Sequence, residues 1–227
     1  MSVVVASSTL AELFTGQSIQ ASDNSLIQGV LHVPEYQRPY CWSGAQLQRL
    51  LDELHRYFKP EPGLQPASHQ FYLGSIILHQ QEVEKEVRLN IIDGQQRLTT
   101  LGLLAWLNRS CSEPKLRYSS PESQRQIQLN LLFLKQHYGD DLNWLDLSRI
   151  NITLVITRRE DDAYRFFETQ NTGGVRLSGP DIIKAHHLRA TARNRQDDYA
   201  KLWENLGELT PLVDAVLKAR HWHALDL

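Results

Sequence analysis

The chain has 227 residues, of which 41% are apolar, so it is long enough to bury one substantial hydrophobic core. Its formal net charge of −2 excludes nucleic-acid binding through the field of the whole chain, so any such site must gather its positive charge locally. The two cysteines, Cys41 and Cys111, exclude a cysteine-rich zinc site, and the lack of signal-peptide and membrane-spanning patterns leads us to expect a cytoplasmic protein.

The first half of the chain alternates helical and extended patterns. A capping box formed by Thr9 and Glu12 predicts a short helix that ends near Gly16. Ser43 is expected to cap a second helix, because leucines follow it at helical spacing. In chain order we expect a helix over 10–16, a strand over 26–33, a helix over 43–57, a hairpin with a long loop between strands 71–79 and 87–92, and a helix over 95–108.

The second half of the chain has a helical pattern apart from one strand. The expected helices cover 121–138, 160–170, 180–195, 197–207 and 210–224, and the expected strand covers 151–157. The sequence therefore predicts an α+β fold, with an α/β head over residues 1–110 and a helical subdomain over residues 111–227 packed on it.

The first segment with candidate functional side chains is 33–42, VPEYQRPYCW, where two prolines fix an extended turn. Arg38 presents a planar fork suited to phosphate, and Gln37 beside it can hydrogen-bond a nucleotide. The aromatic residues Tyr36 and Trp42 either stack on bases or buttress the domain, and both interpretations stay open. We take Tyr36, Gln37 and Trp42 as candidate DNA contacts.

The second segment is 93–100, DGQQRLTT, where a buried strand ends and a helix begins at once. The amides of a helix start, together with an arginine, suit phosphate groups. Asp93 can hold Mg²⁺ or position a water, since hard cations prefer carboxylate oxygens, and plain helix capping is the alternative. The candidate catalytic residues are Asp93, Gln95, Gln96 and Arg97, and the candidate nucleotide contacts also include Gly94 and Thr99.

The third segment, 166–185, ends one helix in a polar loop with two glycines and then begins another helix. Asn171 and Lys184 can form a second polar wall that contacts a nucleotide. The alternative for Asn171 is a helix C-cap, because asparagine followed by glycines is typical of that position.

These three segments, with FYLGSIILH (71–79) leading into the second, stand in an order that resembles the N-terminal domain family of GmrSD-type modification-dependent restriction enzymes. The SspE phosphorothioate sensors carry a similar domain. The resemblance covers about residues 10–190 and implies a ParB/sulfiredoxin-like α/β head with a small mixed sheet. It also implies that the DGQQR segment, 93–97, binds and hydrolyses nucleoside triphosphates. The YQR segment, 36–38, lies beside it and in the sensors is linked to reading the modified backbone.

In this family, nucleotide turnover is coupled to an HNH-type nuclease on a separate domain, and the target is modified DNA. Nothing after residue 190 resembles that nuclease, so we expect it on a partner chain or on a part of the protein that lies outside this sequence. The loop 170–174 lacks the basic residue that relatives carry before the second glycine. We therefore expect a nucleoside triphosphate with Mg²⁺, modified DNA and an HNH-type nuclease as ligands and partners, and we leave self-association open.

Two functions from different classes follow. The chain is either an NTP-hydrolysing sensor domain of a restriction system or a reader of modified DNA that has no turnover of its own. Release of phosphate from nucleotides separates the two. A sulfiredoxin-like redox enzyme is disfavoured, because Cys41 has no histidine near it in the sequence.

Overall fold

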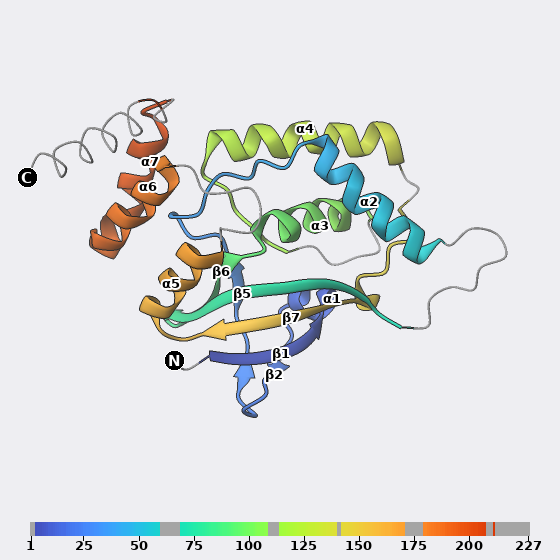
Figure 1. Cartoon of the computed structure of the whole chain (residues 1–227), viewed down its shortest axis with the longest axis horizontal. Helices are drawn as coiled ribbons and strands as arrows, with labels where there is room; N and C mark the ends of the chain where they lie inside the picture. The colour runs from blue at the N-terminus through green and yellow to red at the C-terminus, as the bar shows by residue number, and fades with distance from the viewer. Residues whose placement is uncertain are drawn as a thin grey trace, which may run out of the picture. The chain divides into compact units, whose positions relative to one another are not determined.

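The computed structural model describes residues 3–59, 69–108, 114–139, 142–170 and 179–207, together with residue 211 (Figure 1). Its helices are α1 (Leu10–Thr15), α2 (Gly44–Phe58), α3 (Gln95–Leu107), α4 (Pro121–Tyr138), α5 (Glu160–Gln170), α6 (Gly179–Ala190) and α7 (Arg193–Glu204). Its strands are β1 (Val3–Thr9), β2 (Ile19–Gln20), β3 (Leu26–Ile27), β4 (Val30–His32), β5 (Phe71–Val83), β6 (Glu86–Asp93) and β7 (Ile150–Thr157), and a 3-10 turn covers Leu147–Arg149. The helix expected over 210–224 lies outside the described residues, apart from residue 211.

The chain divides into two compact units. The first comprises Met1–Val33 and Pro39–Phe167 and contains the sheet with helices α1 to α4. The second comprises Pro34–Arg38 and Glu168–Leu227 and contains α6 and α7. This division does not coincide with the boundary expected at residue 110, because β7 belongs to the sheet of the first unit.

The main sheet has five strands in the order β1-β7-β5-β6-β4. Two pairs of strands are antiparallel, namely β1 with β7 and β5 with β6. The other two pairs, β5 with β7 and β4 with β6, are parallel. This mixed sheet with its helices confirms the predicted α+β class. Because β4 and β6 run in parallel, the segments that follow them both leave the sheet at the same edge.

The hairpin of β5 and β6 is tighter than the sequence suggested. Its turn has two residues, Glu84 and Lys85, with φ of 49° and 73°, which is the conformation that a two-residue hairpin needs to match the strand twist. The strand expected over 26–33 is instead split into β3 and β4. Gly29 divides them with φ of 138°, and a Cβ there would lie 2.6 Å from the carbonyl oxygen of Val87.

The hydrophobic core lies on one face of the sheet, under helices α1 to α4. Alternate residues of β7 are buried in it, as the period of a strand requires. The helices contribute leucines at helical spacing, which the sequence predicted for α2 and α3. These core leucines are Leu47, Leu50, Leu51 and Leu54 of α2 and Leu98, Leu101 and Leu104 of α3. Within the described part of the chain, no helix is long and apolar enough to cross a membrane.

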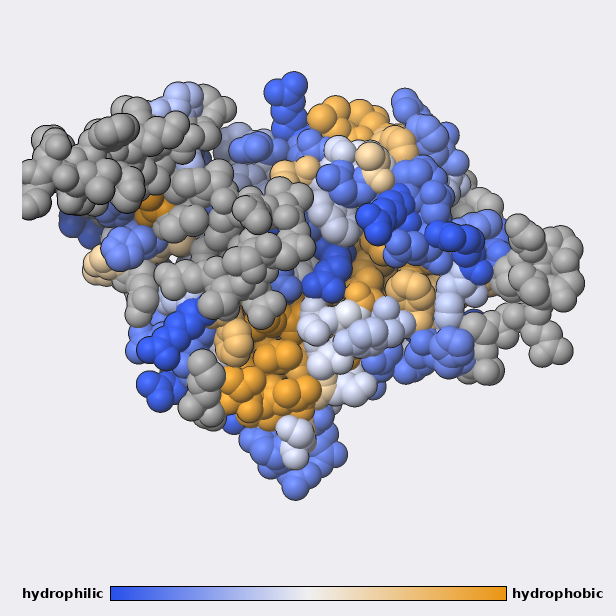
Figure 2. Space-filling model, in the orientation of Figure 1, coloured by the Kyte–Doolittle hydropathy of each residue, from blue (hydrophilic) through white to orange (hydrophobic). Residues whose placement is uncertain are grey.

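The opposite face of the sheet is partly open to solvent. Val5 lies opposite Val155, and Ser75 lies opposite Thr153, so each pair shares a face. On this face Val5 is 42% exposed and Tyr72 is 58% exposed. Figure 2 shows hydrophobic side chains gathered over β1 and β7 beside paler, weakly polar ones.

Candidate functional site

The junction between β6 and α3 is built around a glycine. Gly94 has φ of 95° and ψ of 2°, and a Cβ at this position would collide with the Cδ1 atom of Ile76. Gly94 is itself the N-cap of α3, so the residue at the N-cap position has no side chain with which to cap the first turn. Asp93 therefore does not hold the N-cap position but directly precedes it, next to the partial positive charge of the helix start.

A β-bulge aims Asp93 toward the open face of the sheet. The register between β5 and β6 shifts between Ile77 and Leu78, so that Leu78 lies opposite Ile91 and Ile77 lies opposite Asp93. The extra residue of β6 moves the Asp93 side chain to the face that carries Ile77. There the carboxylate is 37% exposed.

Arg97 lies one helical turn after Asp93 and forms an ion pair with it, with 3.3 Å between Nη2 and Oδ2. The same guanidinium donates to two carbonyl oxygens of β5, from Nη1 to Leu73 at 3.2 Å and from Nη2 to Ser75 at 2.7 Å. The Arg97 side chain is 25% exposed. The arginine thus binds the start of α3 to the second bulge of β5, where the register shifts between Tyr72 and Gly74.

Gln95 and Thr99 face the interior on the other side of α3. Both are buried, and the Thr99 hydroxyl donates to the Gln95 carbonyl at 2.7 Å while it also hydrogen-bonds the hydroxyl of Tyr118. Burial raises the pKa of Tyr118 to about 12, although hydrogen bonds with Thr99 and Gln95 act in the opposite direction. These side chains form a buried polar support behind the first turn of α3.

Gln96 binds the main chain of the segment that follows the YQR motif. Its Oε1 accepts hydrogen bonds from the amides of Cys41 at 3.0 Å and Trp42 at 3.2 Å, and its Nε2 donates to the carbonyl of Pro39 at 3.2 Å. The side chain is buried. The Gln96 carboxamide is therefore occupied in fixing residues 39–42 against α3.

Tyr40 completes this attachment. Its ring is fully buried, and its hydroxyl hydrogen-bonds Thr100 of α3 at 2.8 Å and Asn130 of α4 at 3.0 Å. Its amide donates to the hydroxyl of Ser123 at 2.9 Å. Burial raises the pKa of Tyr40, since a charged phenolate would be poorly solvated there. We call the set of Gln96, Tyr40, Thr100, Ser123 and Asn130 the Tyr40 latch.

Three residues that sequence reasoning missed lie near Arg97 on the open face of the sheet: Tyr72, Ser75 and Thr153. The hydroxyl of Tyr72 donates to Thr153 at 3.1 Å, and hydrogen bonds with Thr153 and Ser75, together with the charge of Arg97, lower the pKa of Tyr72. The signal that could have found them is Gly74 inside the strand, because an isolated glycine in a strand marks a bulge or a close approach by another group.

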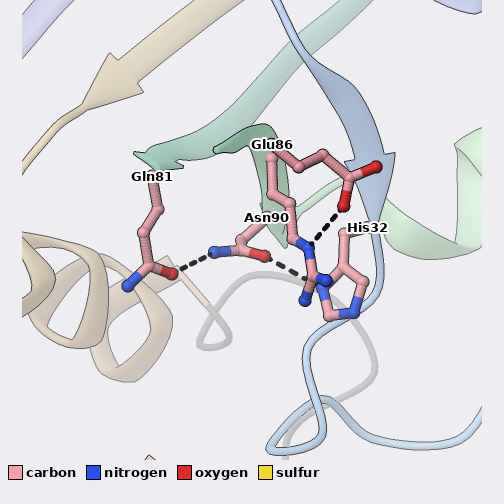
Figure 3. A network of polar contacts seen from close by, with 5 residues as sticks. His32, Gln81, Glu86 and Asn90 are labelled. Carbon is pink, nitrogen blue, oxygen red and sulfur yellow. Dashed lines mark hydrogen bonds and ion pairs between the residues drawn. The ribbon is translucent and has the colours of Figure 1, made fainter. Parts of the chain in front are cut away.

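A polar network ties together the strands that lead into both motifs. The Nδ1 of His32 in β4 lies 2.9 Å from Asn90 Oδ1 in β6, and Asn90 Nδ2 donates to Gln81 of β5 at 3.0 Å. Figure 3 shows these side chains meeting across the three strands. Glu86 lies nearby and forms an ion pair with Arg88 at 3.2 Å. The network fixes the register of β4 beside β6.

Several of the other candidates lie in the second unit or outside the described residues. Tyr36, Gln37 and Arg38 belong to the second unit, where the Gln37 amide donates to the Pro34 carbonyl at 3.0 Å. Lys184 of α6 is buried and pairs with Glu204 at the end of α7, at 3.2 Å. Asn171 lies outside the described residues, so its proposed role stays a prediction.

Two further candidates can be placed directly. Trp42 is only partly buried and packs against the hydrophobic core, which supports the buttressing interpretation for its ring. The exposed thiol of Cys41 lies beside it. Among the described residues, no three histidine, cysteine or acidic side chains gather as a metal site would require.

Comparison with known proteins supports the relationship that the motifs suggested. Residues 10–188 match the model of the family described as GmrSD restriction endonuclease, N-terminal domain, and this span contains all three motif segments. No curated protein matches the sequence. The match covers most of the chain, so this protein belongs to the family of GmrSD restriction endonuclease N-terminal domains and is a component of a restriction system.

Proposed function

We propose that the chain binds a nucleoside triphosphate at the junction of β6 and α3 and hydrolyses it. The observation that carries the proposal is an exposed carboxylate beside an arginine at a helix start whose N-cap is a glycine, with Asp93 Oδ2 at 3.3 Å from Arg97 Nη2. Helix starts of this kind bind phosphate groups through their amides and their dipole. Membership of a restriction endonuclease family supports a task in defence against modified DNA.

The phosphates are held by the first-turn amides of α3 and by Arg97. Leu73, Ser75 and Asp93 account for three hydrogen bonds of the guanidinium, which can donate five. These bonds hold the group in one orientation, so little side-chain entropy is lost when a phosphate binds. Because the pair with Asp93 cancels much of the local charge, the triphosphate needs a second cation.

Arg38 and Mg²⁺ are our proposed sources of that charge. Arg38 directly precedes Pro39, whose carbonyl is bound by Gln96 of α3. Mg²⁺ usually binds proteins through one or two carboxylates and otherwise through substrate phosphates and water. Asp93 offers one exposed carboxylate and is the only acidic residue of the DGQQR segment, which fits an ion that arrives with the nucleotide.

Hydrolysis rests on positioning and charge stabilisation, since phosphoryl transfer to water requires no covalent intermediate on the protein. Asp93 holds the ion or orients the attacking water. Gln95 and Thr99 act through the helix backbone that they and Tyr118 support. Gln96 positions residues 39–42, and we assign it no contact with the nucleotide.

The partners proposed for this activity are modified DNA and an HNH-type nuclease on another domain or chain. Tyr36, Gln37 and Trp42 are the proposed DNA contacts. Asn171 and Lys184 stay proposed nucleotide contacts, although Lys184 would first have to leave Glu204. A reader of modified DNA without turnover is the competing function.

The test is release of inorganic phosphate by the 227-residue chain from each of four nucleoside triphosphates, with and without modified duplex DNA. We expect release that depends on Mg²⁺ and falls at least about 100-fold in Asp93→Ala, because a positioned charge in phosphoryl transfer contributes on this scale. The matched control is Glu53→Ala, which removes the carboxylate of another exposed i,i+4 ion pair, with Arg49 on α2. Binding of modified DNA without phosphate release under any condition would instead favour the reader.

A further inference from the structure

Tyr72 lies across the sheet with one side of its ring exposed. Its backbone lies opposite Asn151, but its hydroxyl reaches Thr153, two residues further along β7, at 3.1 Å. A tyrosine that stood upright on the sheet could not make this diagonal contact, so the ring must lean over the strands. The residue is nevertheless 58% exposed, which leaves the outward side of the ring uncovered.

The ring leans along β5 past Ser75, in the direction of Ile77, and sideways onto β7. Thr153 lies opposite Ser75, whose carbonyl accepts a hydrogen bond from Arg97 at 2.7 Å. Asp93 lies opposite Ile77, only two residues beyond Ser75 on β5. A two-residue step along a strand is about 7 Å, and neighbouring strands are about 4.8 Å apart, so a nucleotide with its base over Tyr72 would cross β5 with its ribose and phosphate chain to reach Asp93.

The chemistry of this surface suits a base. Val5, Val155, Thr153 and Ser75 share the face with Tyr72, and none of them is charged. Aromatic rings that lie on an open sheet face bind bases by stacking, which tolerates any base because each has a π-face. A nucleic-acid strand would also need a series of cations along its backbone, whereas among the described residues Arg97 is the cation that hydrogen-bonds Leu73 and Ser75, next to Tyr72 on β5.

We propose that the exposed side of the Tyr72 ring stacks on the base of the nucleoside triphosphate whose phosphates lie at Arg97, an inference that rests on the proposed function. Thr153 and Ser75 hold the phenol in place, so that the ring is in position before the nucleotide arrives. Tyr72 is then a nucleotide contact on β5, outside the DGQQR and YQR segments. Because stacking does not distinguish bases strongly, the site accepts several nucleotides.

The experiment measures KM and kcat for ATP and GTP, and the inhibition constant of inorganic triphosphate, for the wild-type chain, Tyr72→Leu, Tyr72→Gln and Tyr72→Trp. We expect KM to rise about tenfold in the two variants without a ring and to stay within about twofold of wild type in Tyr72→Trp, with kcat little changed. Inorganic triphosphate has no base, so its inhibition constant should stay the same in all variants. Tyr199→Leu is the matched control, because Tyr199 of α7 is also an exposed tyrosine, at 46%.

The outcomes separate this inference from the function on which it rests. A wild type that hydrolyses nucleotides, together with unchanged KM in Tyr72→Leu and Tyr72→Gln, overturns the stacking role alone. An equal rise in KM and in the inhibition constant of triphosphate also overturns it, since that result means a disturbed phosphate site. A variant that lost affinity for single-stranded DNA but not for nucleotides would assign the ring to nucleic acid. A wild type that neither binds nor hydrolyses any nucleotide removes both proposals.

Discussion

Gly74 of β5 lies directly against Arg97 of α3, where an added Cβ would displace the guanidinium. A Cβ on Gly74 would lie 2.7 Å from Arg97 Nη1, and the φ of 114° at Gly74 is one that other residues rarely adopt. The glycine thus lets the guanidinium reach the carbonyls of Leu73 and Ser75. The position of the proposed phosphate-binding arginine depends on a residue that has no functional group.

Gly74→Ala is expected to lower the free energy of unfolding by about 2–3 kcal/mol, because it adds both a steric overlap and backbone strain. Urea denaturation measures the loss. The control is Gly207→Ala, where φ is 73° but nothing lies within 4 Å of the added carbon, so only the strain of about 1 kcal/mol applies. Equal losses at the two sites would show that Arg97 moves aside without cost.

Gln96→Leu should destabilise the protein by roughly 3 kcal/mol, since it leaves the amides of Cys41 and Trp42 and the carbonyl of Pro39 without their present partner. Thermal unfolding followed by circular dichroism gives the change in Tm. Gln124→Leu is the matched control, because that exposed side chain makes a single hydrogen bond, to the Tyr118 carbonyl at 2.8 Å. If the Gln96 variant were as stable as this control, the hydrogen bonds of Gln96 would not stabilise the attachment of residues 39–42 to α3.

Ionisation of Tyr118 should destabilise the fold at high pH. Its pKa is about 12 in the folded chain against about 10 for an exposed tyrosine, so between these values the folded state holds more protons than the unfolded state. The stabilisation is therefore complete below pH 10 and is lost as the pH rises through about 12. Urea midpoints measured across this range should fall more steeply in wild type than in Tyr118→Phe, and parallel curves would contradict the assignment.

The ion pair of Lys184 and Glu204 should stabilise the packing of α6 on α7. Lys184→Met removes the cation from the Glu204 carboxylate, whose side chain is only 15% exposed. Because the charge then lacks its counter-ion, we expect the free energy of unfolding to fall by about 3 kcal/mol. The double variant Lys184→Met/Glu204→Leu should recover most of it, because no uncompensated charge is left. Since the double variant keeps the helices together, its KM for nucleotides tests whether Lys184 contacts the substrate, and an unchanged KM removes Lys184 from the site.

Local patterns sufficed for much of the fold. The capping box at Thr9 and Glu12, the leucine spacing of α2 and α3, and the apolar runs of β5, β6 and β7 all predicted elements that the structure contains. These elements are marked by their own residues, either through helical period or through caps. The mixed sheet then follows from how the strands pair.

The errors in the fold have long-range causes. β1 was not predicted, because VVVASST becomes a strand by pairing with β7, far away in the sequence. The long hairpin loop was expected because QQEVEKE is polar, but cross-strand pairing extends β5 and β6 through it. Gly29 lies inside the expected strand, but the group that approaches it, the main chain of Val87, is distant in the sequence and could not be foreseen.

The candidate site was predictable in part. The DGQQR segment indicated a helix start with a nearby carboxylate and arginine, and the structure has both. The roles within the segment were not visible, because they depend on partners that lie at a distance in the sequence. Gln96 looked like a ligand group and is instead bonded to residues 39–42, while Tyr72 drew no notice until its register with Thr153 was known.

The place of β7 has a consequence for how the chain folds. β7 lies between β1 and β5, and it brings together residues as far apart as Ser7 and Asn151, which are separated by 144 positions. β1 therefore has no partner in the main sheet until residues 150–157 have left the ribosome. Such a high contact order predicts slow refolding and makes the nascent N-terminus a natural client for chaperones.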